Sequence, residues 1–300
     1  MASGLWLMAC FSPLPRYIAP MRIARTVVEA RAAAAALPEL ALVPTMGALH
    51  AGHVSLMRRG REVGRHVAVS IFVNPMQFGP SEDFMRYPRP LERDLELCRE
   101  AGVDLVFAPG VDEIYPPQEL DVVVDVPALT SMLEGTHRPG HFIGVCRVVA
   151  KLLSIVQPRF ALFGKKDYQQ LKVIEAMAAG LALPVKIVPC ATLRDADGLA
   201  LSSRNAYLTA QQRPRALALH KALLAAQQVI ATGALAPALV EQAMQQELRA
   251  HHLEIDYAVV RDARTLGPLD LINPQLEPVV CLVAARLDGV RLIDSAEVGA

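Results

Sequence analysis

Residues 43–53 read Val43-Pro44-Thr45-Met46-Gly47-Ala48-Leu49-His50-Ala51-Gly52-His53, which is the end of an apolar run, a glycine-containing turn and the start of a helical pattern. Two histidines three positions apart on a helix share one face. Gly52 has no side chain, so a ligand can lie close to the backbone there. The N-terminus of a helix favours phosphate. The stretch therefore predicts a nucleotide site in which histidine donors neutralise charge on the α-phosphate and on leaving pyrophosphate.

The same alternation of strand and helix extends along the first two thirds of the chain. Short apolar runs predict buried strands at residues 40–43, 67–73, 105–108, 160–163 and 185–188. Apolar residues at helical spacing predict helices at residues 54–63, 91–101, 144–156 and 168–181. The order predicts an α/β fold, a Rossmann-like parallel sheet with helices on both faces. Ligands are expected at the carboxyl ends of its strands.

The composition of the sequence and its pattern of apolar residues change near residue 193. Ala- and Gln-rich stretches predict helices at residues 209–231 and 236–251, and apolar runs predict strands at residues 256–260, 278–285 and 290–294. We therefore expect a Rossmann-like nucleotide- and substrate-binding domain over residues 21–192 and a smaller α+β lid domain over residues 193–300. Residues 1–20 are expected to be an extension or a disordered arm. Met21 opens an amphipathic stretch, so both Met1 and Met21 remain possible starts.

Composition excludes several classes of partner. Lys plus Arg and Asp plus Glu both number 30, so the formal net charge is zero and no overall field favours nucleic acid or an anionic membrane. The five cysteines include no C-x-x-C pair, which favours a reduced, cytoplasmic protein. The apolar residues 5–11 are too few to span a bilayer and lack the basic start of a signal peptide.

An H-x-x-H pair has less specific explanations. Two partly exposed histidines would satisfy the pattern, and so would a zinc site, although the spacing and the missing glutamate differ from the common metalloprotease helix. The strand, the glycine turn and the H-x-G-H string together are more specific. They resemble the H-x-G-H nucleotidyl-transferring superfamily, which includes class I aminoacyl-tRNA synthetases.

A second segment, Ile71-Phe72-Val73-Asn74-Pro75-Met76-Gln77-Phe78, ends an apolar strand in Asn-Pro and then an amide. The Pro step stops regular pairing, which places Gln77 near the expected crevice. Its amide donates and accepts, as binding of a hydroxy acid requires. A glutamine that only caps a turn is the alternative.

Two further segments carry cations after predicted strands. Residues 163–171, Phe-Gly-Lys-Lys-Asp-Tyr-Gln-Gln-Leu, place Lys166 and Asp167 at a strand-to-helix junction, where the lysine suits phosphate oxygens. Residues 193–205 include Ser202-Ser203-Arg204, whose hydroxyls and guanidinium suit a triphosphate at a domain boundary. The alternatives are that the two lysines are only solvated on the surface and that Ser-Ser-Arg is a common surface string without a binding role.

The strings PTMGALHAGH, IFVNPMQFGPSEDFMRYPR, FGKKDYQQL and RDADGLALSSRN occur in this order from residue 44 to residue 205. In order and spacing they resemble the pantothenate synthetase family, and the resemblance extends from about residue 21 to the end. It implies an AMP-forming ligase that uses ATP and Mg2+ to join pantoate to β-alanine through a pantoyl-adenylate, releasing AMP and pyrophosphate. The first domain would then bind both the nucleotide and pantoate. A different H-x-G-H adenylyltransferase and a non-catalytic nucleotide-binding module are the alternative functions.

The resemblance also implies roles for individual residues. His53 matches the catalytic proton donor, with His50 beside it, and Lys166 and Arg204 match residues on the phosphates. The implied ATP-binding residues are Met46, Gly47, Ala48, Leu49, His50, Ala51, Gly52, His53, Gly164, Lys165, Lys166, Asp167, Leu193, Leu201, Ser202, Ser203 and Arg204.

Gln77 and Gln170 match the family's pantoate-binding residues, and Gln77 also lies near its β-alanine position. Asp94, with Glu92 nearby, matches an acidic site associated with magnesium and pyrophosphate. The family further implies a homodimer formed through the first domain.

Four positions depart from the family pattern. Lys165 stands where an acidic residue is usual, Arg147 where Thr is usual, Leu201 where Met is usual, and Asp195 where Glu is usual. Arg147 lies in an apolar helical pattern and needs a partner.

Overall fold

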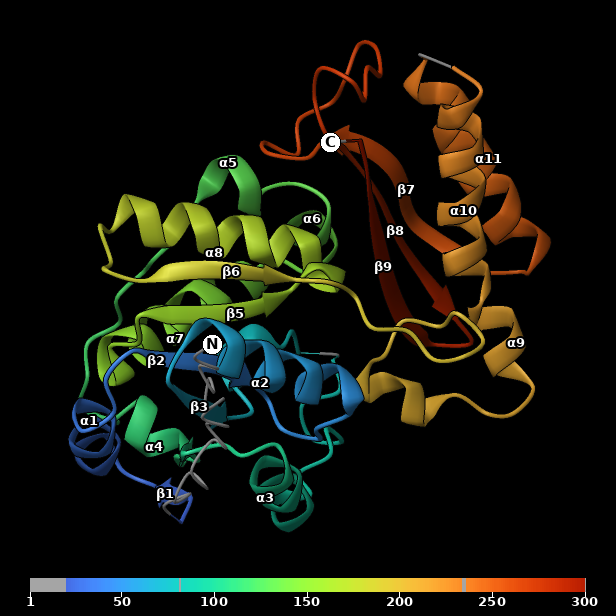
Figure 1. The fold of residues 1–300 in the computed structure, drawn as a ribbon. Helices are drawn as coiled ribbons and strands as arrows, with labels where there is room; N and C mark the ends of the chain where they lie inside the picture. The colour runs from blue at the N-terminus through green and yellow to red at the C-terminus, as the bar shows by residue number, and fades with distance from the viewer. Residues whose placement is uncertain (1–19, 81, 234–235, 300) are drawn as a thin grey trace, which may run out of the picture.

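The computed structural model describes residues 20–80, 82–233 and 236–299, so the extension expected over residues 1–20 lies almost wholly outside the described part. Its larger sheet contains six strands: β1 (Arg22–Ala24), β2 (Leu40–Thr45), β3 (His66–Ile71), β4 (Leu105–Phe107), β5 (Phe160–Gly164) and β6 (Lys186–Cys190). The strands pair in parallel in the order β1-β4-β3-β2-β5-β6 (Figure 1). The chain moves outward from β2 through β3 on one side and returns to β5 on the other. The topological switch point therefore lies between β2 and β5.

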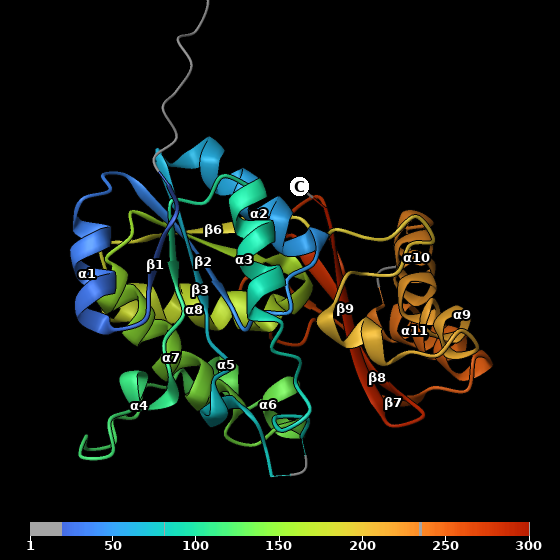
Figure 2. The same ribbon diagram turned by 90° about the horizontal axis from the view of Figure 1, so that it is seen from below.

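Helices cover both faces of this sheet (Figure 2). One face carries α1 (Val27–Ala35), α7 (His141–Val156) and α8 (Tyr168–Gly180), and the other carries α2 (Ala51–Val63) and α3 (Leu91–Glu100). The Rossmann-like α/β fold is confirmed. Shorter helical turns join these elements: η1 (Pro75–Gln77), α4 (Val111–Ile114), α5 (Pro127–Thr130), α6 (Glu134–His137), η2 (Lys165–Asp167) and η3 (Ser203–Tyr207).

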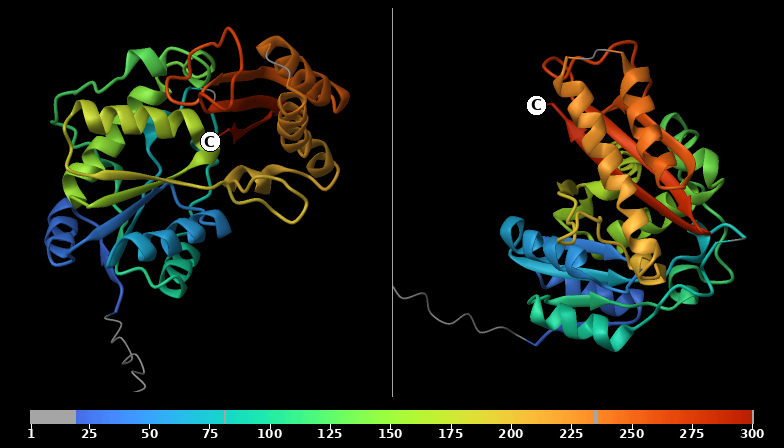
Figure 3. Two further views of the ribbon diagram at one scale, coloured as in Figure 1. Left: turned by 45° about the horizontal axis from the view of Figure 1, so that its top comes forward. Right: turned by 90° about the vertical axis from the view of Figure 1, so that its right-hand side faces the viewer.

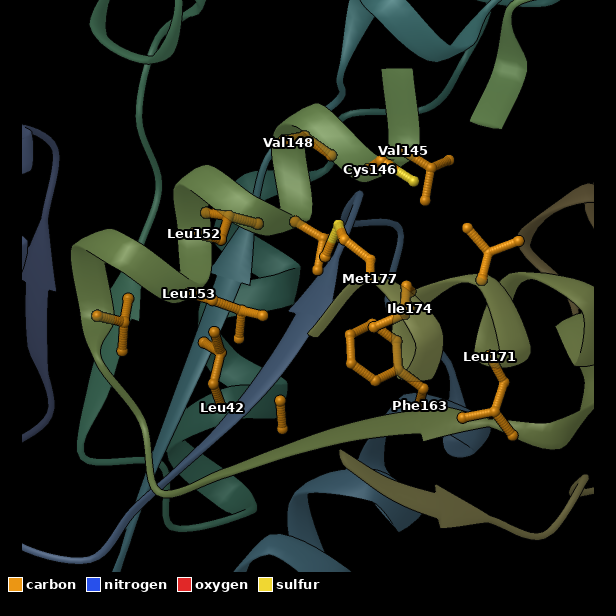
Figure 4. Packing of buried hydrophobic residues seen from close by; sticks show 14 of the residues in the cluster. Leu42, Val145, Cys146, Val148, Leu152, Leu153, Phe163, Leu171, Ile174 and Met177 are labelled. Carbon is orange, nitrogen blue, oxygen red and sulfur yellow. The ribbon is translucent and has the colours of Figure 1, made fainter. Parts of the chain in front are cut away.

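Continuous apolar runs in the strands are explained by two cores, one on each face. Leu40 and Leu42 of β2 belong to the core under α7 and α8, whereas Ala41 and Val43 belong to the core under α2 and α3. Alternate side chains of a strand point to opposite faces, so a strand covered on both sides needs no polar position. In the first core, residues of α7 and α8 pack over β2 and β5. The residues labelled in Figure 4 are Leu42, Val145, Cys146, Val148, Leu152, Leu153, Phe163, Leu171, Ile174 and Met177.

The amphipathic stretch that opens at Met21 contains a short strand followed by a helix. Arg22–Ala24 forms β1 and pairs with β4 at the sheet edge. Helix α1 starts only after Thr26, whose side chain accepts the Glu29 N–H while the Glu29 carboxylate accepts the Thr26 N–H. Such a capping box fixes a helix start, so the residues before it are released to pair with the sheet.

The C-terminal part forms a second, antiparallel sheet in the order β7-β8-β9, from β7 (Glu254–Asp262), β8 (Val279–Leu287) and β9 (Val290–Val298). Helices α10 (Ala218–Ala231) and α11 (Pro237–Ala250) lie against one face of it (Figure 3). The single helix expected over residues 209–231 is divided, because a short α9 (Gln212–Ala216) precedes α10. Pro214 lies in the first turn of α9, where a missing N–H costs little.

The second sheet packs back onto the first part of the chain. Val280 and Leu282 of β8 belong to the core under α7 and α8, while the alternate positions of β8 face α10 and α11. Arg291 of β9 forms a two-point ion pair with Glu134, with both nitrogen-to-oxygen distances 2.6 Å. None of the helices in the described ranges is both long and apolar enough to cross a membrane.

Candidate active site

A cavity of about 240 Å³ opens at the carboxyl ends of β2 and β5, at the switch point of the sheet. Most of the predicted site residues meet on its wall, although they come from four segments far apart in the sequence. They are Met46, His50, Gly52, His53, Gln77, Gly164, Lys166, Asp167, Gln170, Leu193, Leu201, Ser202, Ser203 and Arg204. Gly47, Ala48, Leu49, Ala51 and Lys165 lie outside this wall. Parallel sheets collect the ends of their strands at one edge, which explains the convergence.

The turn after β2 is held by Asp94, which lies in the first turn of α3. The Asp94 carboxylate accepts the N–H groups of Ala48 and Leu49, each at 2.8 Å. Gly47 and Ala48 have positive φ angles of 78° and 50°, so this turn needs an external anchor. Asp94 supplies the anchor, and it thereby fixes where His50 begins α2.

This role does not fit the expectation of a metal site at Asp94. Its side chain is fully buried, and both of its oxygens point at backbone N–H groups. Glu92 is exposed. Within the described residues, no group of three or more His, Cys, Asp or Glu side chains is placed to hold a metal ion. The carboxylate is satisfied by backbone donors, so the geometry does not support a cation there.

His50 and His53 cap the helix that they begin. Nδ1 of His50 accepts the Gly52 N–H at 3.1 Å, and Nδ1 of His53 accepts the His50 N–H at 3.3 Å. The two ring centroids are 4.1 Å apart. Because a backbone N–H can only donate, each Nδ1 must be unprotonated, and the proton of each neutral ring lies on Nε2.

Both histidines are neutral near pH 7. Burial, together with Lys166, lowers the pKa of His50 to about 4. Burial, together with His50 and Lys166, lowers the pKa of His53 to about 3. The pair can therefore offer Nε2–H donors to an anion, but it does not carry positive charge before an anion arrives.

Gly52 has a different use from the one expected. A Cβ at Gly52 would lie 2.8 Å from Cε1 and 2.9 Å from Nδ1 of His50. The missing side chain thus makes room for the His50 ring, which occupies the Gly52 N–H that sequence reasoning reserved for phosphate. Leu201, which lines the cavity, is next at 3.6 Å from that position.

The two adjacent lysines after β5 point to different places. Lys166 lines the cavity, with its Nζ 3.6 Å from Asp167. Lys165 turns to β9, where its ammonium pairs with Glu297 and its carbonyl accepts the Ser295 hydroxyl at 2.7 Å. Successive residues of a tight turn face different directions, so a pair of lysines supplies one cation to the cavity. The nucleotide contact expected of Lys165 is not what its side chain does here.

Arg204 reaches the cavity from the segment between the two sheets. Its guanidinium is held by Asp83, at 2.9 Å and 3.1 Å, and the Ser203 hydroxyl donates to the Ala48 carbonyl at 3.2 Å. The Ser-Ser-Arg string is therefore tied both to the turn after β2 and to the loop after η1. Asp195, one of the departures from the family pattern, pairs with Arg213 at 2.6 Å.

The two predicted glutamines both line the cavity, from opposite sides of the switch point. Gln77 is buried in η1, and Gln170 is half-buried in the first turn of α8. The neighbouring Gln169 is structural, since its amide bonds the backbone of Leu129, Met132 and Glu134. Sequence reasoning selected Gln170 of the Gln-Gln pair, and the structure places that residue on the wall.

Several lining residues were missed by sequence reasoning. Asn74 and Tyr87 lie on the wall, and so does an apolar stripe of α7 formed by Val145, Val148, Val149 and Leu152. Asp83 was missed as the partner of Arg204. Asn74, Asp83 and Tyr87 all fall within the string IFVNPMQFGPSEDFMRYPR, which was the available signal. The apolar stripe gave no signal in the sequence. The positions of α7 that face the cavity are as apolar as those that face the core, so the sequence does not distinguish them.

Arg147, the other cation that departs from the family pattern, lies on the far side of α7 from this cavity. Its guanidinium donates to Asp121 at 2.6 Å and stacks 4.9 Å from the ring centroid of Tyr115. These contacts supply the partner that a buried arginine needs.

Comparison with known proteins agrees with this geometry. Residues 21–297 match the model of the pantoate-beta-alanine ligase family. Pantothenate synthetase of Agrobacterium fabrum is 47% identical over 284 residues, which cover 93% of this chain and 96% of that protein. The enzyme of Moorella thermoacetica is 49% identical over 280 residues, covering 92% of this chain and 98% of that protein.

Two solved structures are similar in fold as well. Pantothenate synthetase of Thermus thermophilus superposes with a TM-score of 0.88 at 47% identity, covering 93% of this chain and all of that one. Pantoate-beta-alanine ligase of Francisella tularensis, solved with beta-gamma ATP and beta-alanine, superposes with a TM-score of 0.76 at 31% identity, covering 92% and 97%. The fold, the cavity and these matches together place the chain in the pantoate-β-alanine ligase family.

Proposed function

We propose that this chain condenses pantoate with β-alanine in an ATP-dependent reaction. The pantoate carboxylate attacks the α-phosphorus of ATP, which forms pantoyl-adenylate and releases pyrophosphate. The β-alanine amine then attacks the acyl carbon, loses a proton and displaces AMP. The observation that carries the proposal is that cationic and histidine side chains suited to phosphate line the same cavity at the switch point as two neutral glutamine amides. Family membership and the ligands of the Francisella relative support it.

The charges of the cavity suit this chemistry. Lys166 and Arg204 provide positive charge for phosphates, while Gln77 and Gln170 provide neutral amides for pantoate. A neutral site leaves the pantoate carboxylate nucleophilic, whereas an arginine clamp would stabilise its ground state. We therefore assign Lys166 and Arg204 to ATP, and Gln77 and Gln170 to pantoate, with Gln77 also near the β-alanine amine.

The histidines act as positioned donors at the reacting phosphate. With Nδ1 of each ring occupied, His50 and His53 direct Nε2–H groups at developing charge on the α-phosphate and pyrophosphate. A proton donor role for His53 requires the phosphates to raise its pKa first. Mg2+ would enter with the nucleotide and neutralise phosphate charge, because the described residues offer it no protein-built site.

We further propose that residues 21–192 form the catalytic domain and that residues 193–300 act as a lid over bound ATP, in the cytoplasm. A lid is supported by Arg204, which approaches the cavity from that part of the chain. A homodimer formed through the first domain follows the family. The exposed Leu120, Val122 and Val123, at 86%, 59% and 71%, offer apolar surface in that domain.

The test measures AMP and pyrophosphate with pantoate, ATP and β-alanine, each omitted in turn. We expect pyrophosphate release to need pantoate and ATP, and steady AMP release to need β-alanine as well. His53→Ala and Lys166→Ala should slow single-turnover adenylation by about 10²- to 10⁴-fold. Pantoate-independent pyrophosphate release would indicate another adenylyltransferase, and ATP binding without turnover would indicate a non-catalytic module.

A further inference from the structure

Asn74 is a buried amide whose four hydrogen bonds are all made. Its Oδ1 accepts the Met76 N–H at 3.2 Å and the Tyr115 hydroxyl at 2.9 Å. Its Nδ2 donates to Gln77 Oε1 at 3.0 Å and to the Gly144 carbonyl at 3.1 Å. Its side chain is 1% exposed, so water does not compete for these positions.

Two backbone groups fix which way this amide faces. The Met76 N–H can only donate and the Gly144 carbonyl can only accept, so the oxygen and nitrogen of Asn74 cannot be exchanged without losing both bonds. Gly144 comes this close because it has no side chain; a Cβ there would lie 2.1 Å from the Met76 carbonyl oxygen. The orientation of Asn74 is therefore built into the contact between α7 and η1.

The orientation of Asn74 determines that of Gln77. Since Asn74 presents N–H to Gln77, the oxygen of the Gln77 amide must face Asn74 and its NH₂ group must face the cavity. In the structure that NH₂ group lies 3.0 Å from the sulfur of Met46. Sulfur is a weak acceptor, so a ligand oxygen would be the better partner.

Tyr115 closes the network from the other side. Its hydroxyl must donate, because Oδ1 of Asn74 can only accept. Burial raises the pKa of the Tyr115 hydroxyl, so it stays protonated. The Arg147 guanidinium lies over its ring at 4.9 Å and Lys151 at 5.5 Å, and the two cations hold the ring against α7.

We propose that Tyr115 and Asn74 are positioning residues that lock Gln77 as a hydrogen-bond donor toward the acid substrate, so that Gln77 reads an acceptor oxygen of that substrate. The proposal rests on the proposed function. Gln170, by contrast, faces the cavity without a comparable bond to another side chain among the described residues, and it is free to turn its amide to suit the ligand. The two glutamines thus have different tasks. The fixed amide of Gln77 selects a substrate that presents an acceptor oxygen, and the amide of Gln170 can turn to suit the group that the substrate presents.

The kinetic test uses two substitutions that keep the shape of the side chain. Tyr115→Phe removes only the hydroxyl and should raise the pantoate KM by about 3- to 10-fold. Asn74→Asp presents oxygen to Gln77 Oε1, which turns the Gln77 NH₂ away from the cavity, and should raise that KM by at least about 10-fold. The ATP KM should stay within about 2-fold in both. Tyr168→Phe is the matched control, since it deletes a buried hydroxyl bonded to Ala263 and Glu297 instead.

A second readout needs no turnover. In the ligand-free wild-type protein, the Gln77 side-chain NH₂ should show a nuclear Overhauser effect to the Met46 methyl group, and Asn74→Asp should abolish it. If the wild-type signal is missing, or if it survives in Asn74→Asp, Gln77 is not locked as proposed. Equal loss of ATP and pantoate affinity in Tyr115→Phe would also overturn the proposal. Failure of the proposed function shows separately, as wild-type protein that does not turn over pantoate.

Discussion

The carboxylate of Asp83 holds the guanidinium of Arg204 at two points, with Oδ1–Nη2 at 2.9 Å and Oδ2–Nε at 3.1 Å. Arg204 is the arginine that we assign to the ATP phosphates. In the structure its charge is thus already paired. An incoming triphosphate must share or displace Asp83, and the pair sets part of the free energy of ATP binding.

We therefore expect Asp83→Asn to lower the KM for ATP by about 2- to 10-fold, because the amide no longer competes with phosphate for the guanidinium. The pantoate KM should not change, since neither residue contacts the glutamines. Initial-rate kinetics with each substrate varied would measure both constants. A higher ATP KM in Asp83→Asn would mean that Asp83 aids ATP binding by ordering Arg204, contrary to our expectation.

The tautomer of His53 leads to a second prediction. The side-chain nitrogen of glutamine can occupy the position of His53 Nε2, whereas that of asparagine reaches only the position of Nδ1. If His53 stabilises the phosphate as a neutral Nε2–H donor, His53→Gln should adenylate pantoate at least about 10-fold faster than His53→Asn in a single turnover. Equal rates in the two variants would instead favour proton transfer by the imidazole, which neither amide can perform.

Asp94 provides a third prediction, which separates an anchor from a metal ligand. Asp94→Ala leaves the buried N–H groups of Ala48 and Leu49 unpaired, so it should lower the free energy of unfolding by about 2–4 kcal/mol in urea titrations. The Mg2+ concentration that gives half-maximal activity should be the same in Asp94→Asn as in the wild-type protein. A large rise in that concentration would restore the metal assignment.

Much of the fold could be predicted because each main strand is covered on both faces. Ala41, Leu42 and Val43 alternate between two cores, so the run is apolar throughout and reads as a strand without reference to its neighbours. β1 gave no such signal, since Arg22 and Ile23 are exposed at the sheet edge and only Ala24 is buried. The capping box at Thr26 was the clue that separated this strand from the helix.

The site was predictable where it depends on strand ends, and less so where it depends on loops. His53, Lys166 and Gln170 follow directly from strand-to-helix junctions, and the order of the strands brings them together. Asp83 and Tyr115 lie in connecting segments between strands and helices, and the path of such segments is known only from the folded structure. The directions of neighbouring side chains, as at Gln169 and Gln170, depend likewise on what each one packs against.

A fourth prediction concerns pH. Burial lowers the pKa of His50 and of His141 to about 4 and that of His53 to about 3, whereas histidines in the unfolded chain titrate near 6.5. Between these values the unfolded chain binds more protons than the folded protein. The free energy of unfolding should therefore be constant above about pH 7 and fall as the pH drops toward 4, by up to about 1.4 kcal/mol per pH unit for each histidine.

Urea unfolding at pH 7.5, 6.0 and 5.0 would measure this dependence. Nε2 of His141 accepts a hydrogen bond from the Arg138 guanidinium, and Nδ1–H of the same ring donates to the Gln77 carbonyl. His141→Gln removes one of the three histidines whose pKa is lowered by folding. The free energy of unfolding should then fall less steeply between pH 6.0 and 5.0, by the slope that corresponds to about one proton, even if the variant is less stable at pH 7.5. An unchanged slope in His141→Gln would show that this ring is protonated in the folded protein.

The adjacent lysines 165 and 166 offer the sharpest contrast between sequence and structure. Lys166 lines the cavity, and Lys165 pairs with Glu297 on β9. We expect Lys166→Ala to slow adenylation by about 10²-fold or more, and Lys165→Ala to leave the ATP KM and the adenylation rate within about 2-fold of the wild type. Lys165→Ala should cost stability instead, by at most about 1 kcal/mol for a partly exposed pair.

Charge reversal tests the same assignment. The single substitutions Lys165→Glu and Glu297→Lys each place like charges together, whereas the double variant restores an ion pair of opposite polarity. Its free energy of unfolding should exceed the value expected if the effects of the two single substitutions simply added, which is the signature of direct contact. If Lys165→Glu instead raises the ATP KM and Glu297→Lys in the same chain does not restore it, then Lys165 binds the nucleotide, as its place beside Lys166 in the sequence suggested.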